Sequence, residues 1–252
     1  VAYDIAAQKV VIAYQDVGNS DYGTAIVGTV SGTSISFGSP VVFQSTYTEH
    51  IAATYDVNAG KVVISYRASS AGKSIVGTVS GTSISFGSSV TFRSGSTVYI
   101  TSCYDASAQK IVIAFQYNGA QGQAIVGTVS GTSISFGSYM TWETTAPYYI
   151  NTAYDSVNNK TVIVYMDGTS SYGRAIVGTV SGTSISAGSS VVFNSGSSQL
   201  PHASFDINAE KILIAYRDGS NSNSGTAVVG TVSGTSISFG TPAVFSSGNM
   251  FW

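Results

Sequence analysis

A ten-residue segment, Val-Gly-Thr-Val-Ser-Gly-Thr-Ser-Ile-Ser, occurs five times in this chain without a change. Its copies begin at Val27, Val76, Val126, Val177 and Val229. A second marker, an Asp followed five positions later by a Lys, also recurs five times, at Asp4/Lys9, Asp56/Lys61, Asp105/Lys110, Asp155/Lys160 and Asp206/Lys211. Both markers advance by 49 to 52 residues per step. Five units of this length account for residues 1–252 as a single domain, with no linker.

The alternation of apolar and polar residues inside one unit predicts four short strands. In the second unit these are residues 51–55, 61–66, 74–79 and 83–86, and residues 90–92 extend the fourth. The segments Asp-Val-Asn-Ala-Gly-Lys and Ser-Gly-Thr-Ser are typical of tight hairpin turns. A four-stranded antiparallel meander repeated five times predicts an all-β fold, a five-bladed β-propeller.

The two ends of the sequence predict how the ring closes. The chain begins with Val1-Ala2-Tyr3-Asp4 and ends with Met250-Phe251-Trp252, and the tail followed by the head aligns with residues 50–56. We therefore expect the first strand of one blade to be shared between the N- and C-termini. The strand before each marker Asp carries small side chains, Ala52, Ala53 and Thr54 in the second unit. Crowding at an axis favours small residues, so this strand is predicted to be innermost.

Composition excludes several classes of protein and site. Only 9% of residues are charged, the net charge is −2, and the ten Lys and Arg are too few and too dispersed for phosphate neutralisation, which argues against nucleic-acid binding. The sequence shows neither a membrane span nor a signal segment, and we expect a soluble protein without membrane insertion. No spacing of Cys and His matches a metal site, and no cofactor motif is present. The single cysteine, Cys103, is predicted to be a packed, inert thiol.

The repeat itself resembles a known kind of array. Residues 27–43 (Val-Gly-Thr-Val-Ser-Gly-Thr-Ser-Ile-Ser-Phe-Gly-Ser-Pro-Val-Val-Phe), followed by Ile-Ala-Ala-Thr-Tyr-Asp and Lys-Val-Val-Ile-Ser-Tyr, resemble repeats in tail-fibre-like structural proteins of marine bacteriophages. The resemblance covers all five units, and Ala187, where the other copies have Phe, is a small departure. It implies a virion-surface or extracellular location and recognition of host glycans, and it brings no catalytic residues with it.

The loops divide into two kinds. Two hairpin classes barely change among the units and fall on one end of the meander, whereas the two classes that vary fall on the other end. A rigid scaffold with diverse loops on one face suits binding. Aromatic rings stack on sugars while Arg and acids bond hydroxyl groups, and the variable face is rich in both. The candidate ligand-binding residues are Tyr22, Tyr47, His50, Arg67, Arg93, Tyr99, Tyr117, Trp142, Tyr149, Tyr172, Arg174, His202, Arg217 and Trp252.

We therefore expect a non-enzymatic recognition or adhesion module that binds a glycan or a host-surface protein. Two alternatives stay open. A structural spacer would need no ligand, and a glycoside hydrolase could draw a carboxylate pair from Glu49, Glu143, Asp16 and Asp167. Against catalysis, the inner strands hold no acid before the turn Asp, and no nucleophile motif is present. Near-identical neighbouring repeats also predict a strand-exchanged oligomer.

Overall fold

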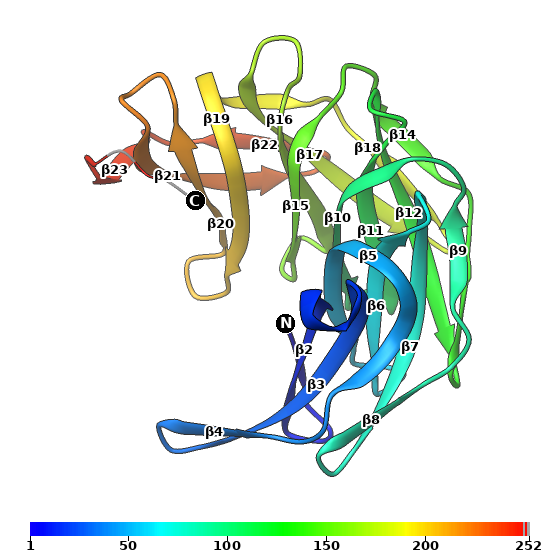
Figure 1. The fold of residues 1–252 in the computed structure, drawn as a ribbon. Helices are drawn as coiled ribbons and strands as arrows, with labels where there is room; N and C mark the ends of the chain where they lie inside the picture. Colours follow the sequence, from blue (N-terminus) through cyan, green and yellow to red (C-terminus); the bar gives the residue numbers. More distant parts are fainter. Residues whose placement is uncertain (249, 251–252) are drawn as a thin grey trace.

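The computed structural model describes residues 1–248 and 250 and shows an all-β fold (Figure 1). Within these residues the chain forms twenty-three strands, β1 to β23, and one short 3-10 helix, η1 (Val17–Asn19). The strand pairings are antiparallel, and they connect the strands into three sheets of nine, five and nine strands. No helix in this part of the chain is long and apolar enough to cross a membrane.

Each repeat supplies the same ladder of strands. In the third repeat, β10 (Thr97–Asp105), β11 (Lys110–Tyr117) and β12 (Gln121–Ser130) pair in chain order. Both β13 (Ser133–Phe136) and β14 (Met140–Glu143) then pair with β12, one beside each half of it. The predicted meander is therefore present, and its fourth strand consists of two segments.

The other repeats follow this order. The strands of the first are β1 (Ala2–Asp4), β2 (Lys9–Asp16), β3 (Tyr22–Ser31) and β4 (Ser34–Phe37). Those of the second are β6 (Lys61–Ala68), β7 (Ala71–Ser80), β8 (Ser83–Phe86) and β9 (Val90–Arg93). Those of the fourth are β15 (Tyr148–Asp155), β16 (Lys160–Met166), β17 (Tyr172–Ser181) and β18 (Ser184–Ala187). Those of the fifth are β20 (Lys211–Asp218), β21 (Ser224–Ser233), β22 (Ser236–Phe239) and β23 (Ala243–Ser246).

Two long strands belong to two repeats each, which is why five repeats appear as three sheets. The first part of β5 (Val41–Asp56) pairs with β3, and its second part pairs with β6. In the same way β19 (Val191–Asp206) pairs with β17 and then with β20. These strands carry the chain from the outside of one repeat to the inside of the next.

The strand before each marker Asp lies nearest the axis around which the repeats are arranged (Figure 1). Side chains of neighbouring inner strands contact one another there: the Thr54 hydroxyl donates to the Ser102 carbonyl oxygen at 3.1 Å. The hydroxyl oxygens of Thr101 and Thr152 are 3.0 Å apart. The small residues of these strands allow this close approach, and the predicted inner strand is confirmed.

The hydrophobic core consists of the interfaces between successive repeats. In one of them, Val63 and Phe92 of the second repeat pack against Ile113 and Phe115 of the third. Three further clusters use equivalent positions. In the second, third and fourth repeats the middle strands β6, β11 and β16 are covered on both faces, which explains why their sequences are nearly continuous apolar runs.

Strand register separates the loops into two ends. The Asp105/Lys110 hairpin and the Ser130/Ser133 hairpin lie at one end of the third repeat, which we call the constant end. The turn between Tyr117 and Gln121 lies at the other end, which we call the variable end. The constant turns need their glycine, because φ is between +58° and +61° at Gly32, Gly81, Gly131, Gly182 and Gly234. At the other constant turn, the Asp105 carboxylate accepts the Ala108 N–H at 2.9 Å.

The predicted closure of the ring falls on Phe251 and Trp252, which lie outside the described residues. Among the described strands, β1 pairs with β2, and the three sheets do not close on one another.

Candidate functional site

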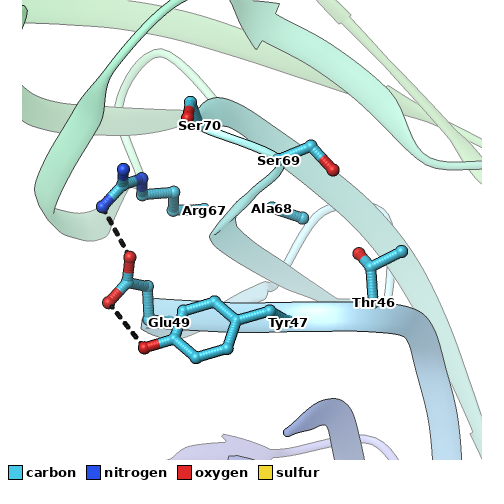
Figure 2. Close-up of a pocket in the computed structure, with 7 residues that line it drawn as sticks. All are labelled: Thr46, Tyr47, Glu49, Arg67, Ala68, Ser69 and Ser70. Atoms are coloured by element: carbon cyan, nitrogen blue, oxygen red, sulfur yellow. Dashed lines mark hydrogen bonds and ion pairs between the residues drawn. The ribbon is translucent and has the colours of Figure 1, made fainter. Parts of the chain in front are cut away.

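A polar pocket opens at the variable end of the second repeat. It has a volume of about 260 Å³ and is lined by residues of β5, β6 and the turn that follows β6 (Figure 2). The lining residues are Thr46, Tyr47, Glu49, Arg67, Ala68, Ser69 and Ser70. Small residues line the turn side of the pocket, and the large polar side chains line the strand side.

The centre of this pocket is an ion pair. Glu49 and Arg67 are directly opposite each other across β5 and β6, and the Arg67 guanidinium donates to Glu49 Oε1 at 2.5 Å. The Tyr47 hydroxyl donates to Glu49 Oε2 at 3.4 Å, and its ring is more than half exposed. The pocket thus presents a donor group, an acceptor group and an accessible aromatic ring side by side (Figure 2).

A bulge after Glu49 links this pocket to a second, axial cavity. The register shifts between Glu49 and Ala52, and His50 takes a left-handed φ of +50°. The third, fourth and fifth repeats have the same shift, with φ of +52° at Tyr99, +53° at Tyr149 and +51° at Leu200. The axial cavity has a volume of about 590 Å³, and all four residues line it.

Aromatic rings gather on the lining of the axial cavity. The Tyr99 ring lies 5.6 Å from the His50 ring, 5.9 Å from Tyr148 and 5.6 Å from Tyr149, between centroids. The Tyr99 backbone N–H donates to His50 Nδ1 at 3.3 Å. Burial lowers the pKa of His50, an effect that Glu49 opposes and Arg67 reinforces. His50 is therefore held in its neutral form, which suits its acceptor role.

His202 lines the same cavity on the fifth repeat. Its Nδ1 lies 3.3 Å from Asn151 Nδ2, and Asn151 Oδ1 accepts the Ala203 N–H at 2.9 Å. A smaller pocket of about 130 Å³ adjoins His202 and includes Arg217, whose guanidinium donates to Gln199 Oε1 at 2.8 Å. Gln199 and Arg217 are in the same cross-strand register as Glu49 and Arg67.

Two other candidate residues, Arg93 and Trp142, are engaged in packing contacts between repeats. The Arg93 guanidinium lies between two rings, 3.6 Å from the centroid of Tyr117 and 4.0 Å from that of Tyr139. The Trp142 ring packs against Tyr165 with centroids 4.6 Å apart, at the position that Phe occupies in other repeats. These contacts stabilise the interfaces between repeats.

Arg174 forms the second ion pair of the described residues, with Nε 2.7 Å from Asp167 Oδ2. Burial raises the pKa of Asp167, but the N–H groups of Ser170 and Thr169 and the Arg174 guanidinium outweigh it, and the pKa is lowered. Tyr172 is the first residue of β17, two positions before Arg174, whereas Asp167 lies in the turn between β16 and β17. Tyr22 is opposite Tyr47 in the β3 and β5 register, and Trp252 lies outside the described residues.

The structure thus gathers the candidates into two places. Tyr47 and Arg67 share the polar pocket, and His50, Tyr99, Tyr149 and His202 share the axial cavity. Sequence reasoning named Glu49 among the carboxylates that a glycoside hydrolase could use, but did not include it among the candidate ligand-binding residues. Its register opposite Arg67 was the signal that could have found it. Nothing in the sequence pattern pointed to Asn151.

Known structures share this fold. No protein-family model and no curated protein matches the chain. A protein from Lactobacillus plantarum superposes with a TM-score of 0.66 and 11% identity, over 93% of this chain and 67% of that one. The SapL1 lectin in complex with alpha methyl fucoside superposes with a TM-score of 0.52 and 12% identity, over 96% of this chain and 83% of that one.

A third structure is AofleA from Arthrobotrys oligospora, in a form with three arginines replaced by alanine. It superposes with a TM-score of 0.57 and 8% identity, over 98% of this chain and 74% of that one. At such identities the likeness is one of fold. The chain is an all-β protein of propeller-like architecture.

Proposed function

We propose that this protein is a non-enzymatic carbohydrate-binding module of five propeller blades in an open arrangement, whose sugar site is the polar pocket of Tyr47, Glu49 and Arg67. The observation that carries the proposal is the ion pair of Glu49 and Arg67, which lies in an open pocket beside an exposed tyrosine ring. The lectin among the proteins of similar fold supports it.

The chemistry of the pocket matches a sugar's two kinds of surface. Neighbouring hydroxyl groups of a sugar ring both donate and accept hydrogen bonds, and Arg67 offers donors while Glu49 offers acceptors. Charge-assisted hydrogen bonds of this kind contribute about 1.5–3 kcal/mol each. The Tyr47 ring supplies an apolar surface for the C–H face of the sugar.

The charge of the pocket favours neutral sugars over acidic ones. Glu49 neutralises Arg67, so the pocket presents no net positive charge to a carboxylate or sulfate group. An anionic sugar would also lie against the Glu49 carboxylate, and like charges at short range repel. We expect a neutral hexose or deoxyhexose to bind.

Two other carboxylates of the variable end, Glu143 and Asp167, are engaged in local interactions, which supports a binding role rather than hydrolysis. Glu143 accepts the Tyr165 hydroxyl at 3.0 Å and the Thr145 hydroxyl at 2.9 Å. Asp167 is paired with Arg174. A general acid needs a carboxyl group free to protonate a leaving group, whereas Glu143 is occupied by its hydrogen-bond partners and Asp167 by its ion pair.

Screening the protein against an array of neutral, sialylated and sulfated glycans tests the proposal. We expect binding to neutral glycans, followed by calorimetric titration with methyl glycosides that include alpha methyl fucoside. Replacing Arg67→Met or Glu49→Gln should weaken binding by about ten- to a hundredfold, the equivalent of one charge-assisted hydrogen bond.

Lys61→Met is the matched control, because Lys61 lies on the same strand, β6, at the constant end. It should leave affinity unchanged. The proposal would be overturned if no glycan on the array bound, or if Lys61→Met and Arg67→Met reduced affinity equally. Exposure at a virion or cell surface, a place among phage tail-fibre-like proteins, and strand-exchanged oligomers stay predictions from the sequence.

A further inference from the structure

The forward face of the fifth repeat is exposed, whereas the same face of every other repeat is buried. Phe245 is 61% exposed, but its equivalents Phe43, Phe92 and Phe193 are 5–8% exposed. Val229 is 46% exposed, and its equivalents Val27, Val76, Val126 and Val177 are fully buried. Leu213 is exposed on the same face. We call Leu213, Val229 and Phe245 the forward free face.

The first repeat exposes the opposite face. Ile35 is 44% exposed, while Ile84, Ile134, Ile185 and Ile237 at the same position are 2–6% exposed. Phe37 is half exposed. Tyr14 is only partly buried, although its equivalents Tyr66, Phe115 and Tyr165 are fully buried. We call Tyr14, Ile35 and Phe37 the backward free face.

The two free faces are the two halves of one kind of interface. Inside the protein, Phe43 of the first repeat packs against Tyr66 and Phe86 of the second, with ring centroids 5.1 and 5.8 Å apart. Phe92 and Phe193 make the same pair of contacts with the repeats that follow them. Phe245 is the same projecting ring without a receiving pair, and Tyr14 with Phe37 is a receiving pair without the ring.

The close backbone contact that joins one repeat to the next is also missing after the fifth repeat. A Cβ added to Gly38, Gly87, Gly137 or Gly188 would lie only 1.9–2.0 Å from a threonine carbonyl oxygen of the next repeat. At Gly240 of the fifth repeat the nearest atom is 3.8 Å away and belongs to Val229 of that repeat. No described residue occupies the place of the next repeat.

These faces do not have the chemistry of a terminus exposed to water. In repeat proteins whose ends face solvent, the terminal repeats carry polar outer surfaces. Here both ends keep the apolar residues of the interior interfaces, and none of the six residues is charged. Figure 1 shows the opening between the strands of the fifth repeat and those of the first. Contiguous exposed apolar surface of this kind marks an interaction site.

We propose that the opening is a docking slot for one further four-stranded unit of the same repeat type. Its backward face would receive Phe245, and its forward face would supply the ring that Tyr14 and Phe37 receive. Continuity with the four existing interfaces supports this occupant, because only such a unit presents both complementary faces at once.

Extending the chain inside its array tests the proposal without altering either end. In a six-repeat variant, residues 98–147 are duplicated in tandem, which preserves the register at Tyr148. Hydrogen exchange of the strands that hold Ile35 and Val229 is measured in both chains, together with binding of an apolar dye. We expect rapid exchange and dye binding in the five-repeat chain, and protection to the level of Ile84 and Val126 with loss of dye binding in the six-repeat chain.

A pair of substitutions provides a second measurement. In the five-repeat chain, Phe245→Ala should shift the melting temperature by less than about 2 °C, whereas Phe92→Ala should lower it by roughly 6–20 °C. In the six-repeat chain both substitutions should lower the melting temperature by a similar amount, because both rings are then buried between repeats. If the six-repeat chain does not fold, the five-repeat comparison still decides the question.

Three outcomes would overturn the proposal. Protection of Ile35 and Val229 in a monomeric five-repeat chain, or an equal cost of Phe245→Ala and Phe92→Ala, would show that the chain closes on itself. Protection that appears only in a dimer, detected by sedimentation, would show that a second copy covers the faces. Unchanged exposure in a folded six-repeat chain would show that one repeat does not fill the opening.

Discussion

The ring of Phe193, at the end of the fourth repeat, packs against the ring of Tyr216 in the fifth with centroids 5.2 Å apart. Phe43 with Tyr66, Phe92 with Phe115 and Trp142 with Tyr165 repeat this relationship at the other three interfaces. One aromatic residue per repeat therefore connects each repeat to the next, and the interfaces should govern stability.

Replacing Phe193→Ala should destabilise the protein by about 3–5 kcal/mol, because it removes a buried ring and leaves a cavity between two repeats. Urea unfolding followed by fluorescence measures the change. Val192→Ala is the control, since Val192 is the neighbouring residue but points to solvent and should cost less than about 0.5 kcal/mol. Similar costs for both would show that the interface does not govern stability.

Gly87→Ala and Gly240→Ala occupy equivalent positions but should differ in effect. At Gly87 the new Cβ would meet the Thr132 carbonyl oxygen at 1.9 Å, so the two repeats must move apart, at a cost of about 1–3 kcal/mol or more. At Gly240 the methyl group enters open space and should cost less than about 1 kcal/mol. Thermal unfolding of the two variants checks this, and a larger loss at Gly240 would contradict it.

Stability should decrease as the pH falls below about 6.5, and His50 should account for part of the decrease. Burial lowers the pKa of His50 in the folded state, so the unfolded chain binds a proton more readily. The contribution is complete above the unfolded pKa and is lost as the pH falls toward the folded value. His50→Gln should flatten the pH dependence of the unfolding free energy between pH 7.5 and 5, and an unchanged slope would contradict this.

Cys103 should resist thiol reagents in the folded protein. Burial raises the pKa of its thiol to about 12, and the thiol lies 3.9 Å from the Thr161 hydroxyl of the next repeat. The reactive thiolate is therefore nearly absent at neutral pH. We expect slow alkylation by iodoacetamide at pH 8 and rapid alkylation in urea, measured by mass spectrometry. Equal rates in the two conditions would refute an inert thiol.

Much of the fold could be predicted from the repeats. Because the ten-residue motif and the Asp105/Lys110 type of turn recur at fixed intervals, strand order, the division into two ends and the inner strand all followed from local patterns. The fourth strand was predicted less well, since it divides into β8 and β9 after Phe86, where Gly87 passes close to the next repeat.

The candidate site was harder to predict, because its residues meet through register and bulges. Arg67 was expected on the variable face, but its pairing with Glu49 depends on which residue of β5 is opposite it. Arg93 looked equally available in the sequence, yet Tyr117 and Tyr139 enclose its guanidinium. Residue type alone does not distinguish these two arginines.

The sequence by itself determined the repeating unit, its strands and its turns, because side-chain alternation and glycine-dependent turns act over a few neighbouring residues. Only the tertiary structure decided which residues form a pocket and which are buried in packing contacts. It also decided that the faces of Phe245 and Ile35 stay uncovered. Identical repeats have identical local preferences, so the difference between a buried interface and a free one depends on whether another repeat lies beside it.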